Sequence, residues 1–109
     1  MVLYVNPKFR NYTGRVIYKF ICPEGKVYVG KANSSRKRIR GHKSEAFRKN
    51  EDGTWRCESR WKQAIRRIGW DNLVVEILQC VRKGGDLNKR ERYWIAKYNA
   101  DDPEYGYNS

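Results

Sequence analysis

The pattern of hydrophobic and polar positions contains two apolar stretches that are joined by a short turn. Residues 15–22 are β-branched or aromatic at most positions, a Pro-Glu-Gly turn follows, and residues 26–30 return to the apolar character. This pattern predicts a β-hairpin. With a three-residue loop, Tyr18 lies opposite Gly30. Tyr18 and Tyr28 then share one face as diagonal cross-strand neighbours, with open space beside them at the glycine.

Two helices are predicted after the hairpin. A proline-free segment at 36–49 follows several N-cap candidates, and residues 50–56 have the composition of a surface loop. A second helix is predicted at 58–68, ending at a glycine. Its apolar positions recur at helical spacing and are expected to be buried: Trp61, Ala64, Ile65 and Ile68.

A third strand and a last helix complete the predicted order. Residues 73–78 are apolar and β-branched, which is typical of a strand buried on both faces. Asp86 or Asn88 can cap a helix that continues to about Tyr98. The order predicts an α+β domain with a small, three-stranded, mainly antiparallel sheet flanked by helices. We place this domain at 15–109, after an N-terminal arm at 1–14 with some strand character.

The charge balance points to a polyanionic partner. The 109 residues suit one domain and include 24 Lys and Arg against 12 Asp and Glu, a net charge of +12. A compact domain repels itself at this charge, and nucleic acid is the commonest partner that offsets it. A basic protein without a specific ligand is the alternative.

Other features exclude several classes of protein. No run of 18 apolar residues and no signal-peptide core is present, so we expect a soluble, cytoplasmic protein with no membrane partner. The three cysteines form no CxxC pair and His42 is the only histidine, which excludes a zinc finger. A catalytic metal would therefore depend on carboxylates.

A carboxylate interrupts the apolar stripe of the last predicted helix. Glu91 shares that stripe with Leu87, Trp94, Ile95 and Tyr98. Burying a carboxylate costs several kcal/mol, on the order of what pairing or metal coordination offsets. A capping box over 88–91 explains the glutamate equally well at this point.

Arg38 and His42 stand four residues apart in the first predicted helix and so project from one side. His42 also aligns with Ile39 and Ala46, which places it at the edge of the buried face. A neighbouring group there can adjust its pKa toward neutrality for proton transfer. A packing role for His42 and a solvated position for Arg38 are the simpler alternatives.

The basic residues are concentrated in two segments, one following the hairpin and one in the second helix. A duplex lying against both would be bound through its phosphates, whereas two solvated helix faces are the alternative. The residues expected to contact DNA are Lys31, Arg36, Lys37, Arg40, Lys43, Arg60, Lys62, Arg66 and Arg67.

Together, these motifs resemble the GIY-YIG nuclease superfamily from residue 15 to residue 108. The GIY strand corresponds to Val16-Ile17-Tyr18, with the glycine replaced, and YIG corresponds to Tyr28-Val29-Gly30. Arg38 and His42 match the family's helix motif. Glu91 matches its last-helix glutamate, and Gly106-Tyr107-Asn108 matches its GYN tail. Each motif is weak alone, but the ordered set is specific.

The resemblance implies an endonuclease that hydrolyses phosphodiester bonds in double-stranded DNA with one divalent cation. Glu91 would hold Mg²⁺, or Mn²⁺ as a substitute, with water and phosphate oxygens in the remaining positions. Tyr18 would activate the attacking water, and His42 would accept or relay its proton. An ordinary phenol has a pKa of about 10 and needs such help at pH 7.

The same resemblance gives roles to four further residues. Arg38 would clamp the scissile phosphate, a task suited to its forked cationic donor, and Lys31 would assist it. Tyr28 would position water or phosphate, and Asn108 would tie the tail to the site.

The biological role stays open among homing, restriction, repair and phage functions, in a bacterial or phage-infected host cell. A lysine after YIG resembles the excision-repair incision subunit, whereas His42 and the tail resemble phage homing and restriction enzymes. We expect site selection to need a homodimer, or a separate sequence-reading partner or domain. A non-catalytic nucleic-acid-binding module with a nuclease-like fold is the alternative function.

Overall fold

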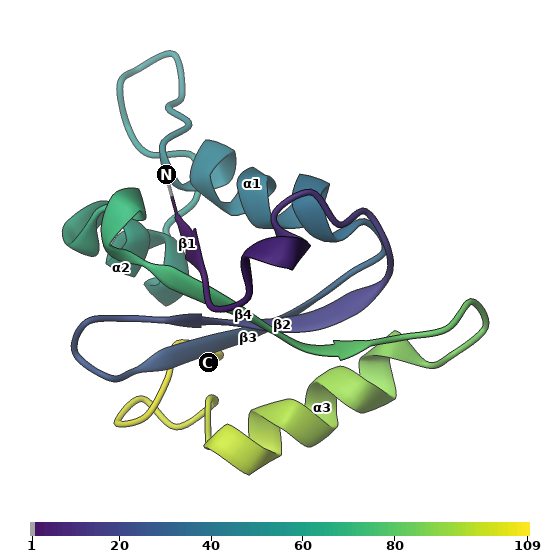
Figure 1. Ribbon diagram of the computed structural model, residues 1–109. Coiled ribbons are helices and arrows are strands. Elements are labelled where there is room, and N and C mark those ends of the chain that lie inside the picture. The colour runs from purple at the N-terminus through teal and green to yellow at the C-terminus, as the bar shows by residue number, and fades with distance from the viewer. Residues whose placement is uncertain (1) are drawn as a thin grey trace.

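A four-stranded mixed sheet lies between two layers of helices. The computed structural model describes residues 2–109. Helices α1 and α2 cover one face of the sheet and α3 covers the other (Figure 1). The strand order is β1-β4-β2-β3. The elements are β1 (Leu3–Tyr4), a 3-10 turn (Pro7–Phe9), β2 (Val16–Ile21), β3 (Val27–Ala32), α1 (Ser35–Ala46), α2 (Arg60–Ile68), a 3-10 turn (Trp70–Asn72), β4 (Val74–Cys80) and α3 (Leu87–Tyr98).

The β2–β3 hairpin has the predicted register. Tyr18 pairs with Gly30 and Phe20 with Tyr28 in antiparallel strands. Gly25 closes the turn at φ +92°, a conformation that glycine adopts without a steric penalty. The hairpin prediction, with both tyrosines on one face, is therefore confirmed.

The sheet has one strand more than predicted. β1 pairs in parallel with β4, where Leu3 lies opposite Val74, and Val2 is buried in the core. The N-terminal arm therefore extends the sheet of the domain, although Met1 lies outside the described residues. Two residues are too few to give a period-2 pattern, so the sequence shows no clear strand there. The α+β class and the mainly antiparallel pairing are confirmed.

The strand predicted at 73–78 is less buried than expected. Within β4 only Val75 is fully buried, and most of its other residues are half-buried. The strand is confirmed and both its faces contact a core cluster, one through Ile77 and the other through Leu78, but the burial is partial because only the short β1 lies on its outer side.

The two helices on the first face pack as their sequence pattern predicts. Ile39 and Ala46 of α1 and the apolar stripe of α2 meet β2 in the main core, although Ile68 is only half-buried. α1 ends at Ala46, three residues before the predicted end, and a loop follows. Among residues 2–109, no helix is long and apolar enough to cross a bilayer.

Candidate active site

Tyr18 lies at the centre of the sheet, on the face covered by α1 and α2. Its side chain is 1% exposed. A Cβ atom added at Gly30 would overlap the Tyr18 ring, so the phenol fills the space that the sequence suggested would be open. Gly30 is therefore needed for the close approach of the ring to β3.

Tyr28 is half-buried beside Tyr18 and is held by an aromatic stack. Its ring lies parallel to the indole of Trp61 from α2, with centroids 4.8 Å apart and planes 3° apart. The ring also meets the imidazole of His42 edge to face at 5.3 Å. Sequence analysis predicted that Trp61 is buried, but not that it supports a candidate catalytic residue.

His42 is buried among the two tyrosines and α2. Its Nε2 lies 2.5 Å from the Tyr18 hydroxyl. On the opposite side of the ring, Nδ1 lies 2.8 Å from Lys62 Nζ and 3.3 Å from Trp61 Nε1. Burial, followed by the charges of Lys62 and Arg38, lowers the pKa of His42 to about 2.

This environment corrects one prediction. His42 was expected at the edge of the buried face with a pKa near neutrality, but it is 1% exposed. The aromatic rings of α2 and the hairpin cover it, and burial disfavours the charged imidazolium.

Arg38 and Lys62 are joined by a carboxylate that sequence analysis did not identify. Arg38 Nη1 donates to both carboxylate oxygens of Glu45 at 3.1 Å, and Lys62 Nζ donates to Glu45 Oε2 at 2.9 Å. Arg38 also lies close enough to Tyr18 and Tyr28 that its charge lowers the pKa of both phenols.

The two phenols are nevertheless protonated at neutral pH. Burial is the largest influence on Tyr18 and raises its pKa well above the usual value, and the neighbouring Tyr28 adds to this increase. Burial likewise raises the pKa of Tyr28. A phenol in this site can act as a base only after it has lost its proton. That ionisation requires a nearby positive charge that stabilises the phenolate.

Glu91 faces the site from α3. Asp86 caps this helix, because its carboxylate accepts a hydrogen bond from the Lys89 backbone at 3.1 Å. Glu91 therefore lies one turn into the helix, and the capping box over 88–91 does not form. Its Oε1 is 3.9 Å from Lys31 Nζ. Burial raises the pKa of Glu91, and its charge in turn raises the pKa of Tyr18 and Tyr28.

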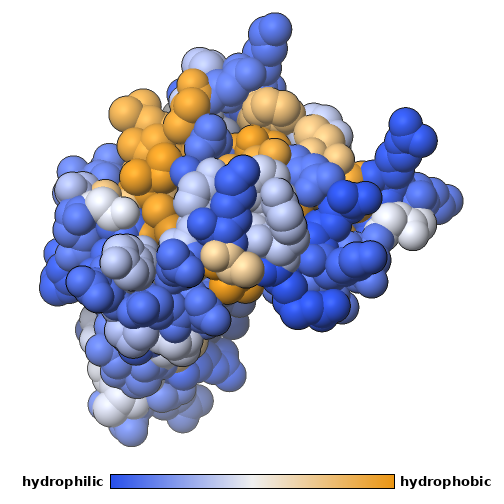
Figure 2. All heavy atoms as spheres, turned by 90° about the horizontal axis from the view of Figure 1, so that it is seen from below, coloured by the Kyte–Doolittle hydropathy of each residue, from blue (hydrophilic) through white to orange (hydrophobic). Residues whose placement is uncertain are grey.

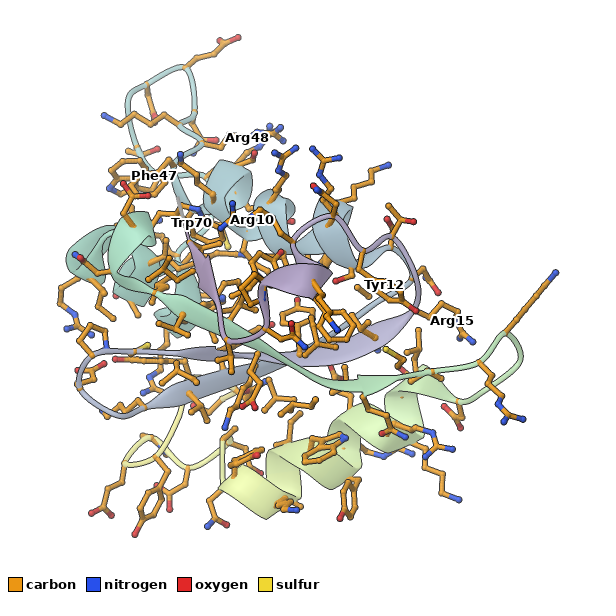
Figure 3. All side chains as sticks on the ribbon, viewed as in Figure 1. Arg10, Tyr12, Arg15, Phe47, Arg48 and Trp70 are labelled. Atoms are coloured by element: carbon orange, nitrogen blue, oxygen red, sulfur yellow. The ribbon has the colours of Figure 1, made fainter. Side chains whose placement is uncertain are left out.

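A groove of about 560 Å³ opens beside these groups. Lys31, Arg38 and Arg15 line it together with residues 85–88 at the start of α3. Arg15 donates to the carbonyl oxygens of Arg82 and, at 3.0 Å, of Gly85. Figure 3 shows Arg15 at the end of the sheet where the β4–α3 loop begins. Arg15 thus adds positive charge to the groove and fixes its wall.

The C-terminal tail lies along β3. Gly106 forms a bridge with Val27, and a Cβ atom at Gly106 would collide with the backbone of Ala100 and Val27. The Asn108 amide accepts from the Val29 N–H at 2.8 Å and donates to the Val29 carbonyl at 2.7 Å. Asn108 therefore holds the strand that carries Tyr28, as its motif suggested.

Tyr107 secures the same tail to the hairpin turn. Its hydroxyl donates to Glu24 and accepts from Arg67 at 2.7 Å. Its ring packs on Trp61, and Arg60 lies over the ring at 5.3 Å.

Two of the residues predicted to contact DNA use their charged groups in contacts within the protein. Lys62 is 6% exposed and its ammonium faces His42 and Glu45. Arg66 donates to the carbonyls of Ala46 and Cys57, which fastens the loop after α1. The prediction that Lys62 contacts a duplex was wrong, because Lys62 is one of the buried positions of α2. Arg66 is half-buried and also pairs with Glu58 at 3.1 Å, and its contact with DNA stays a prediction.

The remaining predicted DNA contacts have side chains at the surface. Lys31, Lys37, Arg40 and Lys43 are exposed around α1, and Arg36 is half-buried. Arg67 is exposed beside the tail and Arg60 is half-buried there. The face that carries α3 is also mainly hydrophilic, with hydrophobic residues in small groups (Figure 2).

The donor set for a metal ion is small. Within residues 2–109, no group of three or more His, Cys, Asp or Glu side chains could hold a metal. Glu91 is the carboxylate that faces the two phenols from α3, and its ion pair is with Lys31, whereas Glu45 is already paired with Arg38 and Lys62. A cation bound by one carboxylate must fill its other positions with water and substrate oxygens, which Mg²⁺ accepts.

Comparison with family models places this fold in a family of nuclease type. A family model described as the GIY-YIG catalytic domain matches residues 15–108, and the chain belongs to this family. Comparisons with curated proteins and with solved structures gave no match.

Proposed function

We propose that this protein is an endonuclease that hydrolyses phosphodiester bonds in double-stranded DNA with one divalent cation. The observation that carries the proposal is the convergence of two phenols, a guanidinium and a half-buried carboxylate beside a basic groove. Family membership supports the nuclease reaction, and the net charge of +12 supports a nucleic-acid substrate.

Glu91 is the residue that we propose to hold the cation. Burial raises the pKa of this carboxylate, so a positively charged partner is needed to stabilise its ionised form. Without a bound cation, that partner is Lys31. A bound Mg²⁺ or Mn²⁺ would polarise a phosphate oxygen and lower the pKa of water. Lys31 is exposed enough to turn toward a phosphate when the cation takes its place.

Tyr18 is the proposed acceptor of the proton of the attacking water, and Tyr28 is the proposed positioning group. Burial holds both phenols in one orientation, because Gly30 admits the first ring and Trp61 stacks on the second. Fixed groups lower the entropic cost of aligning water with the phosphorus atom.

Arg38 is the proposed clamp for the scissile phosphate. Its side chain is 41% exposed, so it can reach the groove while Glu45 holds its guanidinium at 3.1 Å. A planar cation that never loses its proton suits the charge that develops on the non-bridging oxygens. Arg38 also favours ionisation of Tyr18, since its charge lowers the pKa of that phenol.

The exposed cations around α1 would bind the duplex backbone. Lys37, Arg40 and Lys43 lie on the same helix as Arg38, so DNA bound there places a phosphate near the groove. Such contacts are almost independent of sequence and weaken steeply with salt. We therefore propose that site selection comes from a second copy of the chain, or from a separate sequence-reading partner or domain.

The cellular role is proposed at the level of DNA processing in the cytoplasm of a bacterium or a phage-infected host. Homing, restriction, repair and phage roles differ in the DNA that is cut. Cleavage products mapped on supercoiled, linear and branched DNA would sort these roles by preference.

Incubation of supercoiled plasmid with the protein and Mg²⁺ tests the activity. The proposal predicts nicked plasmid that disappears when a chelator is added and returns with excess Mg²⁺ or Mn²⁺. Binding of the plasmid without nicking, in the presence of Mg²⁺ and Mn²⁺ in turn, would instead support a non-catalytic nucleic-acid-binding module.

A further inference from the structure

A continuous set of polar contacts connects the candidate catalytic tyrosine to the candidate phosphate clamp. Tyr18 contacts His42, His42 contacts Lys62, and Lys62 contacts Glu45. Glu45 then accepts two hydrogen bonds from Arg38. Lys62 is the member that comes from α2, and its buried ammonium bridges the histidine and the glutamate.

The contacts at Nδ1 of His42 determine which ring nitrogen carries the hydrogen. The Lys62 ammonium has three donors and no acceptor, and the Trp61 indole N–H is a donor only. Both point to Nδ1, at 2.8 Å and 3.3 Å. Nδ1 must therefore offer its lone pair, and a hydrogen on Nδ1 would meet two donors without an acceptor.

The opposite ring nitrogen must then carry the hydrogen. A neutral imidazole has one N–H, so Nε2 donates to the Tyr18 hydroxyl oxygen at 2.5 Å. The Tyr18 hydroxyl hydrogen consequently points away from His42. This direction is opposite to the one that a histidine accepting the tyrosine proton requires.

The groups around the imidazole support one neutral form. Tyr18 and Tyr28 face it from the hairpin, Lys62 and Trp61 from α2, and Arg38 and Glu45 from its own helix. A second proton on the ring would have to sit on Nδ1, which lies 2.8 Å from the Lys62 Nζ. Two like charges at that separation repel strongly in a buried site.

We propose that Lys62 is a positioning residue that holds His42 with its hydrogen on Nε2, so that His42 donates to Tyr18 and stabilises the phenolate. The inference rests on the proposed nuclease function for its catalytic meaning. For this role Tyr18 first gives its hydroxyl proton to a water molecule on the side away from His42, and the phenolate, stabilised by the His42 N–H, then takes one proton from the attacking water. The imidazole gains no proton at any step.

Long-range ¹H–¹⁵N correlation spectra of protein labelled in histidine test the inference directly. His42 is the only histidine, so both ring-nitrogen signals come from this residue, and their different couplings to the carbon-bound ring protons distinguish Nδ1 from Nε2. A protonated and an unprotonated ring nitrogen differ widely in chemical shift. We expect one unprotonated signal for Nδ1 and one protonated signal for Nε2, unchanged between about pH 8 and about pH 5.5. The reverse assignment, or averaged signals, would overturn the proposal.

Two variants separate Lys62 from the other donor at Nδ1. In Lys62→Met the ammonium is lost but the side-chain length is kept, and we expect the two nitrogen signals to move toward each other. In Trp61→Phe, Lys62 remains and the single neutral form should persist. Unchanged spectra for Lys62→Met would show that Lys62 does not fix the ring.

Nicking kinetics give the second readout. Lys62→Met should lower kcat at least tenfold, and Lys62→Arg should restore part of it, because arginine also donates to Nδ1. DNA affinity should stay within about twofold of that of Lys8→Met, an exposed variant with the same charge loss, if Lys62 makes no phosphate contact. A kcat equal to that of the wild type would contradict the positioning role. The spectra need no DNA, so a protein that cleaves nothing would refute the nuclease proposal without changing the histidine result.

Discussion

Acid should destabilise this protein through its buried imidazole, His42. The folded protein holds His42 neutral with a pKa of about 2, whereas the unfolded chain has the ordinary value of 6.5. Below pH 6.5 the imidazole therefore binds a proton in the unfolded state but not in the folded state. The stabilisation is fully present above pH 6.5 and is lost progressively as the pH falls from 6.5 toward 2.

The magnitude follows from that difference in proton binding. Each pH unit below 6.5 costs about 1.4 kcal/mol, so the free energy of unfolding should be about 2 kcal/mol lower at pH 5 than at pH 7.5. Any folded pKa below about 4 gives the same result, since His42 then stays neutral at pH 5. Hydrogen bonds lower the pKa values of Glu24 and Glu45, so these groups act mainly at more acidic pH. Burial raises the pKa of Glu91, so its protonation opposes the loss of stability, and a variant that lacks only the imidazole separates the two effects.

Urea denaturation followed by tryptophan fluorescence measures the effect. A loss of about 2 kcal/mol should lower the midpoint by roughly 1–2 M urea between the two pH values. His42→Gln provides the matched control, because glutamine is polar and similar in size to histidine but has no ionisable group. Equal midpoints at pH 7.5 and pH 5 for the wild type would refute the buried neutral imidazole. So would the same shift in His42→Gln.

Three further outcomes are expected. Gly30→Ala should displace the Tyr18 ring and reduce nicking about 100-fold with an unchanged circular dichroism spectrum; an unaltered rate would contradict the close approach. Gly106→Ala should lower the free energy of unfolding by about 1–3 kcal/mol, because its Cβ meets backbone atoms; wild-type stability in urea would argue against that packing. Arg40→Ala should reduce the salt dependence of duplex binding, measured by fluorescence anisotropy, by about one counterion, whereas an identical slope would remove Arg40 from the DNA surface.

The parts of the fold that depend on local pattern were predictable from the sequence. The hairpin followed from two short apolar runs and a glycine-containing turn, and its register placed Tyr18 against Gly30 as observed. β1 could not be found in this way. It has two residues and pairs with a strand about 70 residues later, so no local periodicity marks it.

The candidate site was predictable where a residue stood out from its surroundings. Glu91 did so because a carboxylate in an apolar stripe needs a partner. The roles of Glu45 and Lys62 were missed because charged residues on helices are usually solvated. Their spacing carried a signal: Glu45 follows His42 by three residues and Arg38 by seven, and Lys62 precedes the buried Ile65 by three. Such spacings place each pair on one side of its helix.

The extent to which His42 is buried could not be predicted from the sequence pattern of its own helix. Ile39 and Ala46 predicted a position beside the buried face, but Trp61 and the hairpin aromatics cover the imidazole from other elements. Helical periodicity describes one face of one helix, whereas burial depends on what packs against it.

In the proposed function Glu91 completes the catalytic site, whereas other residues bind the DNA. Plasmid nicking with Mg²⁺ and duplex affinity should be measured together for the wild type, Glu91→Gln and Glu51→Gln, an exposed variant with the same change in charge. We expect Glu91→Gln to lose more than about 100-fold in nicking rate and to bind the duplex as tightly as Glu51→Gln, which should nick as fast as the wild type. Wild-type nicking by Glu91→Gln would contradict the account.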